Sequence, residues 1–217
     1  MMITALFLAA AVGTSAIEEP YYKLYYADDE PRTNRTGIVV IDAGHGGANE
    51  GAKGPSGTLE KDVNLLLAKD VRDEIILRGY KVVMTRDEDE EIELLDRPKV
   101  ACLVEADAFI SIHHNATAPG VDPNAVRYET VYAWNEIGER LASAIERKLA
   151  QALKGAPESR GVKHANFAVT RNPEIPSCLI EVDFISSPEG EKAILDKARR
   201  KETAKAIAEG FADWARL

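Results

Sequence analysis

The chain of 217 residues is poor in cysteine, in aromatic residues and in positive charge. Its two cysteines, Cys102 and Cys178, are too few for a disulfide scaffold and wrongly spaced for a zinc cluster, so we expect two buried thiols. Lys and Arg total 27 against 36 Asp and Glu, which gives a formal net charge of -9 at pH 7. A nucleic acid is therefore not expected as a partner, and the bulk charge would not draw the protein to an anionic polymer.

The chain also lacks internal repeats, low-complexity tracts and any apolar run of membrane-spanning length, so no stable membrane span is expected. One short apolar run, residues 3–12, is followed by small residues. We predict a secretory signal peptide over residues 1–16, although no Lys or Arg precedes Lys23; the alternative is a short buried N-terminal helix. Residues 17–36 contain two prolines and mixed charges, which predicts a linker or a loosely docked arm.

Residues 37–217 are predicted to form one domain, because 45% of the chain is hydrophobic and its length allows one substantial core. Apolar stretches of strand length alternate with helical stripes. This order predicts an α/β fold: a single twisted, mostly parallel sheet of about six strands with helices on both faces. The expected strands include 38–41, 80–85, 108–112, 127–133 and 176–184. The expected helices are 63–75, 98–105, 137–149 and 204–214. Gly79 is expected to stop the first of these helices and Gly155 the third.

Polar side chains that bind divalent metals occur at the ends of these strands. His45 directly follows the first expected strand, the pair His113 and His114 follows the third, and Glu181 interrupts the last. Ligands of open α/β sheets gather at the carboxyl ends of the strands, so these groups can build one site. Together with Glu60, they offer the two imidazoles and one carboxylate that suit a catalytic zinc ion.

The second carboxylate, Glu181, indicates hydrolysis as the type of reaction. A zinc ion lowers the pKa of a bound water to about 7 and polarises a carbonyl group under attack. A carboxylate with a raised pKa, about 6 to 7, would take the proton of the water and return it to the leaving nitrogen of an amide. Glu181 is the candidate because an unpaired carboxylate in a buried strand is costly without a function. The sequence therefore predicts a zinc hydrolase.

Each assignment has a plainer alternative. His45 lies among glycines and could simply tolerate a turn, and Glu60 could offset the positive end of a helix dipole. Alternation along a strand sends His113 and His114 to opposite faces, so at most one of them faces a given metal ion. A phosphate-binding loop at residues 44–47 is not expected, because the lysine and the spacing of a P-loop are missing.

Six segments, in order along the chain, carry a resemblance to a known family. They are 41–47 (IDAGHGG), 59–62 (LEKD), 85–86 (TR), 94–97 (LLDR), 109–116 (FISIHHNA) and 179–186 (LIEVDFIS). From about residue 37 to 214 the chain resembles the zinc-dependent N-acetylmuramoyl-L-alanine amidases of the amidase_3 type, which cut peptidoglycan between the sugar and its stem peptide. The resemblance implies that His45, Glu60 and His113 bind one zinc ion and that Glu181 is the catalytic carboxylate. It selects His113 over His114.

The resemblance also implies a substrate and a location. The expected reaction is hydrolysis of the amide between N-acetylmuramic acid and L-alanine, with peptidoglycan as the partner of a secreted, periplasmic or cell-wall protein, and we expect a monomer. Arg97 and Asn115 are expected to bind substrate, although Arg97 could instead pair with Asp96 or cap a helix. Some relatives carry an inserted helix that plugs the zinc site, and the loop 116–124 is too short for one. We therefore expect an open site.

The chain departs from the family pattern at four positions without losing a predicted ligand. It has Ala43 where proline is common, His114 in place of a small or apolar residue, Asp183 in place of glycine and Ser187 in place of asparagine. Asp183 lies two residues from Glu181 and is expected on the same face of the strand, which would keep one of the two carboxyl groups protonated. On that hypothesis Asp183→Gly shifts the acidic limb of the pH–rate profile to lower pH.

Two other functions remain open from the sequence. The first is a non-catalytic peptidoglycan-binding module of the same fold, and Glu181 argues against it because binding needs no general base. The second is a metallohydrolase that acts on another amide, which the mass of the products would distinguish.

Overall fold

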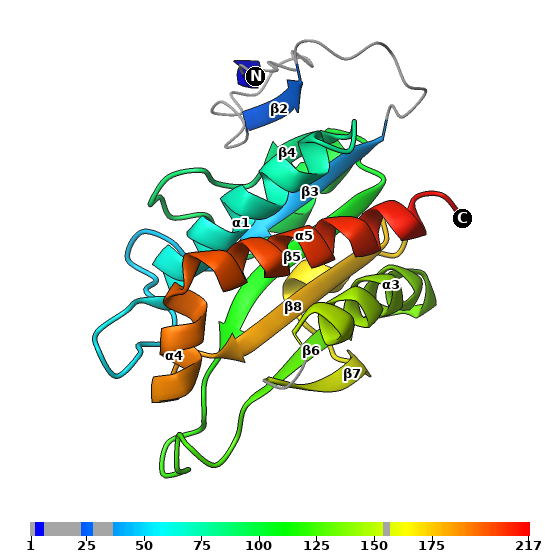
Figure 1. The fold of residues 1–217 in the computed structure, drawn as a ribbon. Helices are drawn as coiled ribbons and strands as arrows, with labels where there is room; N and C mark the ends of the chain where they lie inside the picture. Colours follow the sequence, from blue (N-terminus) through cyan, green and yellow to red (C-terminus); the bar gives the residue numbers. More distant parts are fainter. Residues whose placement is uncertain (1–2, 7–22, 28–36, 154–156) are drawn as a thin grey trace.

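The computed structural model describes residues 3–6, 23–27, 37–153 and 157–217. These residues form one sheet with the strand order β1-β2-β4-β3-β5-β8-β6-β7, and helices cover both of its faces (Figure 1). The strands are β1 (Ile3–Leu6), β2 (Lys23–Ala27), β3 (Ile38–Ala43), β4 (Lys81–Met84), β5 (Ala108–Asn115), β6 (Tyr128–Ala133), β7 (Glu158–His164) and β8 (Ser177–Phe184). The helices are α1 (Glu60–Ile76), α2 (Arg97–Leu103), α3 (Glu136–Ala152), α4 (Pro188–Leu195) and α5 (Lys197–Trp214), with a short 3-10 helix, η1 (Ala168–Thr170).

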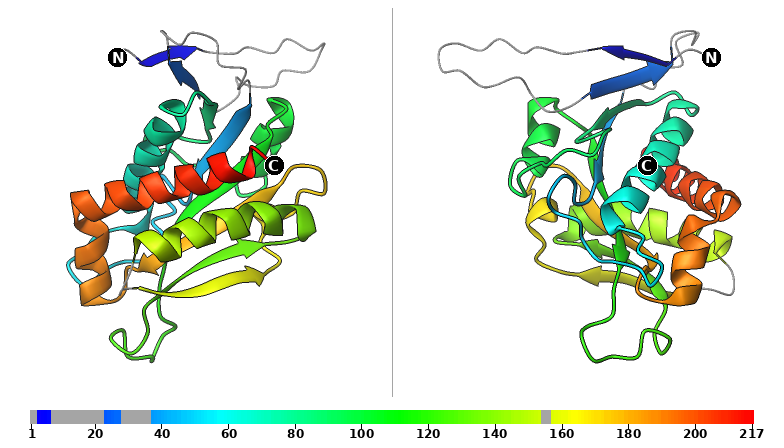
Figure 2. Two further views of the ribbon diagram at one scale, coloured as in Figure 1. Left: turned by 45° about the vertical axis from the view of Figure 1, so that its right-hand side comes forward. Right: turned by 90° about the vertical axis from the view of Figure 1, so that its left-hand side faces the viewer.

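The central strands alternate between two cores. In β3, Val39 and Ile41 belong to the core under α1, α3 and α5, whereas Val40 belongs to a second core with α2 and η1. The right-hand view of Figure 2 shows α1 and α5 on one side of the sheet and α2, drawn in green, on the other. Because successive side chains of a strand point to opposite faces, both faces of the buried strands are apolar. The predicted fold class is confirmed.

Most pairings in the sheet are parallel. From β3 onwards the six strands pair in parallel, except for the antiparallel pair β8 and β6. The edge strand β7 was not expected, because most of its residues are polar and no more than partly buried. The helix α4 was not expected either, although Ser187 and Pro188 give a helix-start signal and the Ser187 side chain accepts a hydrogen bond from Gly190 N–H.

The first two strands extend the sheet beyond β4 in antiparallel pairings. β2 is held by Tyr25, which is buried, donates a hydrogen bond to Asp87 and lies under the guanidinium of Arg72 at 4.5 Å. β1 lies within the predicted signal peptide and β2 within the predicted linker or docked arm; both assignments stay predictions. The predicted helix stop at Gly155 lies outside the described residues.

The two cysteines differ in exposure. Cys178 is buried in β8, as expected, but Cys102 is exposed on the outer face of α2, so the prediction of two buried thiols is wrong for Cys102. A seven-residue helix buries only one face, and its buried residues are Arg97, Val100 and Ala101. Among the described residues, no helix has the length and the apolar character needed to cross a membrane.

One buried carboxyl group in this sheet predicts how stability depends on pH. Glu129 of β6 is 0% exposed, and neither of its carboxyl oxygens has a hydrogen-bond partner among the described residues. Burial raises the pKa of Glu129 to about 7 against the lowering effect of the nearby Ser159 hydroxyl, and the Glu146 carboxylate adds to the rise. The folded state therefore favours the protonated acid, whose stabilising contribution is full below pH 4.5 and is lost as the pH rises through about 7.

We expect Glu129→Gln to remove this loss. Between pH 5 and pH 8 the wild-type free energy of unfolding should fall by up to about 3 kcal/mol more than that of the variant, which stays neutral. Urea unfolding at the two pH values measures the difference, and Glu158→Gln, at an exposed glutamate, is the control. Equal pH dependence in wild type and Glu129→Gln would show that Glu129 is ionised in the folded protein.

Candidate active site

Three side chains from distant parts of the chain meet at the carboxyl ends of β3 and β5. His45 Nε2 lies 3.1 Å from Glu60 Oε1, and His113 Nδ1 lies 3.0 Å from the same oxygen. The two imidazole rings are 4.9 Å apart and nearly perpendicular. Potential ligand atoms of the three residues all lie within 4.8 Å of one another, so among the described residues this group could hold a metal ion. The structure thus brings together the three side chains that the sequence singled out.

The hydrogen bonds around His45 show that the group fits a cation. Asn49 Oδ1 also accepts from Gly51 N–H, so it acts as the acceptor, and His45 Nδ1 donates to it at 2.8 Å. A neutral His45 then presents the lone pair of Nε2 to a Glu60 oxygen, and two lone pairs at 3.1 Å need a proton or a cation between them. An imidazole oriented by a second partner and a carboxylate are typical zinc ligands.

The turn that carries His45 is strained and braced. His45 has a φ of 63°, in the left-handed region that residues other than glycine seldom adopt. Arg97 donates to the carbonyl oxygens of Ala43 and His45, at 2.8 and 2.7 Å. Arg86 donates to the carbonyl oxygens of Ala43 and Gly44, at 2.8 and 2.9 Å. Two buried guanidinium groups therefore fix the backbone that aims the imidazole.

Arg97 is held in place by a buried carboxylate. Asp42 accepts from Arg97 at 2.9 Å, from Thr85 at 2.7 Å and from Ser111 at 2.6 Å. Burial alone would raise the pKa of Asp42, but the Arg97 charge and the two hydroxyl donors hold it below its usual value. The suggested pair of Arg97 with Asp96 is wrong, because Asp96 pairs with Lys99. Arg97 does line the cavity, and its contact with substrate stays a prediction.

Glu60 is oriented from several sides. It is the first residue of α1, where the negative charge of a carboxylate interacts favourably with the positive end of the helix dipole. Its side chain is buried, and the residue is 5% exposed. Its Oε2 accepts from Ala52 N–H at 2.8 Å, and its Oε1 lies 3.4 Å from Asn64 Nδ2 one turn further along α1. Burial would raise the pKa of Glu60, but the hydrogen bonds with His113 and His45 hold it far below its usual value. Glu60 therefore faces both imidazoles as an anion.

His114 points away from this group. It is buried, its Nδ1 lies 2.7 Å from Asn64 Oδ1, and burial lowers its pKa to about 4. The expectation that only one of the two adjacent histidines faces the cluster is confirmed.

The close packing around Gly44 gives a test of this geometry. A Cβ atom at Gly44 would lie 2.2 Å from His113 Nε2, which is too close for two atoms that are not bonded. We expect Gly44→Ala to displace the His113 ring and to weaken zinc binding about tenfold or more. Competition with a chromogenic chelator measures the affinity. Gly120→Ala is the control, because its φ of +85° strains the local backbone but the added Cβ meets nothing within 4 Å; equal affinity in both variants would contradict the packing argument.

Glu181 lies beside the cluster on the neighbouring strand. In the parallel pair of β5 and β8 it is in register with His113, so the two side chains share a face of the sheet. Its Oε2 atom is buried and has no hydrogen-bond partner among the described residues. Burial raises the pKa of Glu181 to about 8, and the negative charge of Glu60 adds to the rise. A carboxyl group of this kind can both accept and donate a proton near neutral pH.

Asp183 does not share that face, so the hypothesis built on it is wrong. The three residues of β5 from His113 to Asn115 run opposite the four residues of β8 from Glu181 to Phe184. This bulge interrupts the alternation. Asp183 is buried and forms a two-point ion pair with Arg127, at 3.0 and 2.6 Å. The expected effect of Asp183→Gly on the acidic limb of the pH–rate profile loses its basis.

The four side chains open into a cavity of about 380 Å³. Asn115 lines it at the end of β5, with its side-chain oxygen accepting from Ala116 N–H at 2.8 Å, and its role toward substrate stays a prediction. Residues 116–127, all of which the structure describes, contain no helix, and they project beyond the sheet in Figure 1. No inserted helix of this loop covers the site, in agreement with the expectation of an open site.

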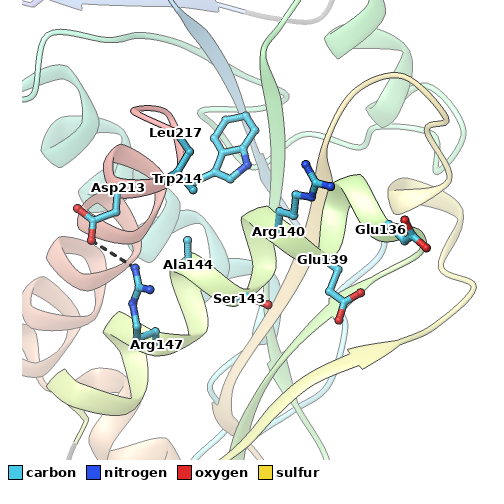
Figure 3. Close-up of a pocket in the computed structure, with 9 residues that line it drawn as sticks. All are labelled: Glu136, Glu139, Arg140, Ser143, Ala144, Arg147, Asp213, Trp214 and Leu217. Atoms are coloured by element: carbon cyan, nitrogen blue, oxygen red, sulfur yellow. Dashed lines mark ion pairs between the residues drawn. The ribbon is translucent and has the colours of Figure 1, made fainter.

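No supporting role was predicted from the sequence for Asp42, Asn49, Asn64 or Arg86, although Asp42 and Arg86 stand in segments that carry the resemblance. Asn64 could have been found, since it is a polar residue one helical turn after Glu60 within an otherwise apolar stripe. A larger hollow of about 740 Å³ between α3 and the end of α5 shares no residue with the site. Figure 3 shows its labelled side chains, among them Trp214, Arg140 and the ion pair of Arg147 with Asp213.

An α/β fold with a His-Glu-His group and an adjacent buried carboxyl at the strand ends is typical of metal-dependent hydrolases. Residues 39–213 match the family model described as N-acetylmuramoyl-L-alanine amidase, Amidase_3. The chain belongs to this family, as the resemblance predicted.

Individual relatives agree with this assignment. The chain is 34% identical to the "Probable cell wall amidase LytH" of Staphylococcus epidermidis over 80% of its own length and 56% of the relative, so it spans little more than half of that protein. Solved structures of amidases are also similar to the chain, and two of them illustrate the match. One is the amidase AmiC2 of Nostoc punctiforme, with a TM-score of 0.78, 34% identity and coverage of 83% of this chain and 98% of that one. The other is the catalytic domain of the amidase CwlV from Bacillus (Paenibacillus) polymyxa var. colistinus, with a TM-score of 0.77, 32% identity and coverage of 83% and 99%.

Proposed function

We propose that the protein is a zinc-dependent hydrolase that cleaves the amide between N-acetylmuramic acid and the L-alanine of the stem peptide, outside the cell or in the cell wall. The observation that carries the proposal is Glu181, in register with His113 and next to the His45-Glu60-His113 group. The relatives named as N-acetylmuramoyl-L-alanine amidases supply the bond that is cut. A binding module would need the metal group but no proton acceptor beside it.

In this proposal His45, Glu60 and His113 hold one zinc ion. When bound, zinc lowers the pKa of a water molecule and polarises the carbonyl group of the scissile amide. Glu181 takes the proton of the attacking water at its buried carboxyl and delivers it to the leaving nitrogen. The Arg97 and Arg86 contacts keep the His45 turn fixed throughout, so the site needs little reorganisation during the reaction.

Mass spectrometry of digested peptidoglycan tests the proposal. The zinc-loaded chain should release stem peptides with a free N-terminal L-alanine and leave glycan strands with intact lactyl groups, and a chelator should stop the release. Products cut within the peptide or within the glycan would indicate a different hydrolase, and binding without any new amino group would indicate a binding module.

A further inference from the structure

The cavity around the metal group has two apolar walls. Ile92 and Leu94 come from the segment that precedes α2, and Phe167 and Val169 come from the segment of η1. Leu94 is 57% exposed and Phe167 is 37% exposed, so both offer contact surface to a ligand. These side chains do not hold the metal group. Their exposed apolar surface at the site therefore needs another explanation.

The two walls lie over opposite parts of the sheet. The segment before α2 packs on the His45 turn of β3, where the backbone of Glu90 and Glu91 closely approaches Gly46 and Gly47. Phe167 stands over β6, since its ring contacts the Tyr132 ring edge-on at 5.1 Å. β5 and β8 lie between β3 and β6 in the strand order, so the metal group and Glu181 lie between the walls.

Neither wall is built for an anionic group. Arg97 is the one lysine or arginine among the described residues that line the cavity, and its guanidinium contacts Asp42 and the carbonyl oxygens of Ala43 and His45. An apolar wall without a free cation fits uncharged, partly apolar groups, such as a methyl side chain or the C–H face of a sugar.

The chemistry gives the cleft a direction. In amide hydrolysis the water oxygen bonds to the acyl carbon, the C–N bond breaks and the water proton ends on the nitrogen. The donor must come within about 2.6–3.2 Å of that nitrogen. Glu181 is on β8, the side of the metal group nearer to β6 and Phe167. The amino acid that carries the leaving nitrogen therefore extends toward Phe167, and the acyl group extends toward Leu94.

We propose that Phe167 and Val169 bind the alanine end of the stem peptide and that Ile92 and Leu94 bind the lactyl-sugar end. This assignment rests on the proposed amide hydrolysis and makes the two walls separate subsites for the two products.

Titrations with the two products, followed by NMR on the zinc-loaded full chain, test the assignment. The probes are peptide-free glycan strands with their lactyl groups and a free stem peptide that begins with L-alanine. Phe167→Ala should weaken peptide binding about fivefold and leave glycan binding unchanged, and Leu94→Ala should do the reverse. Trp134→Ala and Leu95→Ala are matched controls, because these residues are 40% and 64% exposed and line no part of the cavity.

The outcomes separate the assignment from the function. The opposite pattern, an equal loss for both products in either variant, or no binding of either product to the wild type would overturn the assignment. Murein that stays uncleaved by the wild type would overturn the proposed function instead, whatever the titrations show, because product binding needs no turnover.

Discussion

Replacing Glu181 by glutamine should lower the rate of murein cleavage by about 10²- to 10⁴-fold while the protein keeps its zinc. Glutamine has nearly the same shape but cannot take the proton of the attacking water. The metal group does not include Glu181, so zinc binding should remain within a small factor of wild type. Release of free amino groups from murein measures the rate, and metal analysis after gel filtration measures the zinc.

The control for this change is Glu174→Gln, an exposed glutamate in the segment that leads into β8. It should leave both the rate and the zinc content unchanged. A Glu181→Gln protein that cleaves murein at a wild-type rate would remove Glu181 from the mechanism. Loss of zinc together with activity would instead assign Glu181 to the metal group.

Replacing His45 by asparagine should abolish both zinc binding and activity. Asparagine tolerates the left-handed backbone that His45 adopts, with a φ of 63°, so the turn should survive. Removal of one of three ligands should cost more than the 10- to 100-fold in metal affinity that loss of a supporting residue typically causes. Isothermal titration with Zn²⁺ measures the affinity, and the urea midpoint checks that the fold is intact.

His164→Asn is the matched control, since His164 is exposed at the end of β7 and pairs with Glu139. It should bind one zinc ion with wild-type affinity. If His45→Asn also binds one zinc ion at that affinity, the metal lies elsewhere and the account of the site is wrong.

The sequence predicted the parts of the fold that depend on local pattern. The apolar run 38–41 and the stripe of Val63, Leu67, Val71 and Ile75 have one physical solution each, a buried strand and a helix that packs on it. The polar edge strand β7 follows no such pattern, because an edge strand in contact with solvent needs little apolar surface. Its pairing with β6 depends on tertiary contacts, which the local sequence pattern does not show.

The site was predictable as a set of residues and less so as a geometry. His45, the His113–His114 pair and Glu181 could be named because imidazole and carboxylate groups near the carboxyl ends of buried strands are typical of a ligand site. Glu60 instead begins a helix, and the choice of His113 over His114 came from the family resemblance. The face of Asp183 could not be predicted, because the bulge between Glu181 and Phe184 shifts the alternation by one residue. The contacts of the Arg97 guanidinium with Asp42 and the His45 turn could not be predicted either, because these partners are 52 to 55 positions away in the chain, and its contact with substrate stays a prediction.

An anomalous difference map at the zinc absorption edge, from crystals of the zinc-loaded protein, locates the metal ion directly. We expect one strong peak within bonding distance of His45, Glu60 and His113, with the Glu181 carboxyl facing the same space. A peak bound by other residues, or a Glu60 side chain turned away from both imidazoles, would contradict this assignment of the metal site.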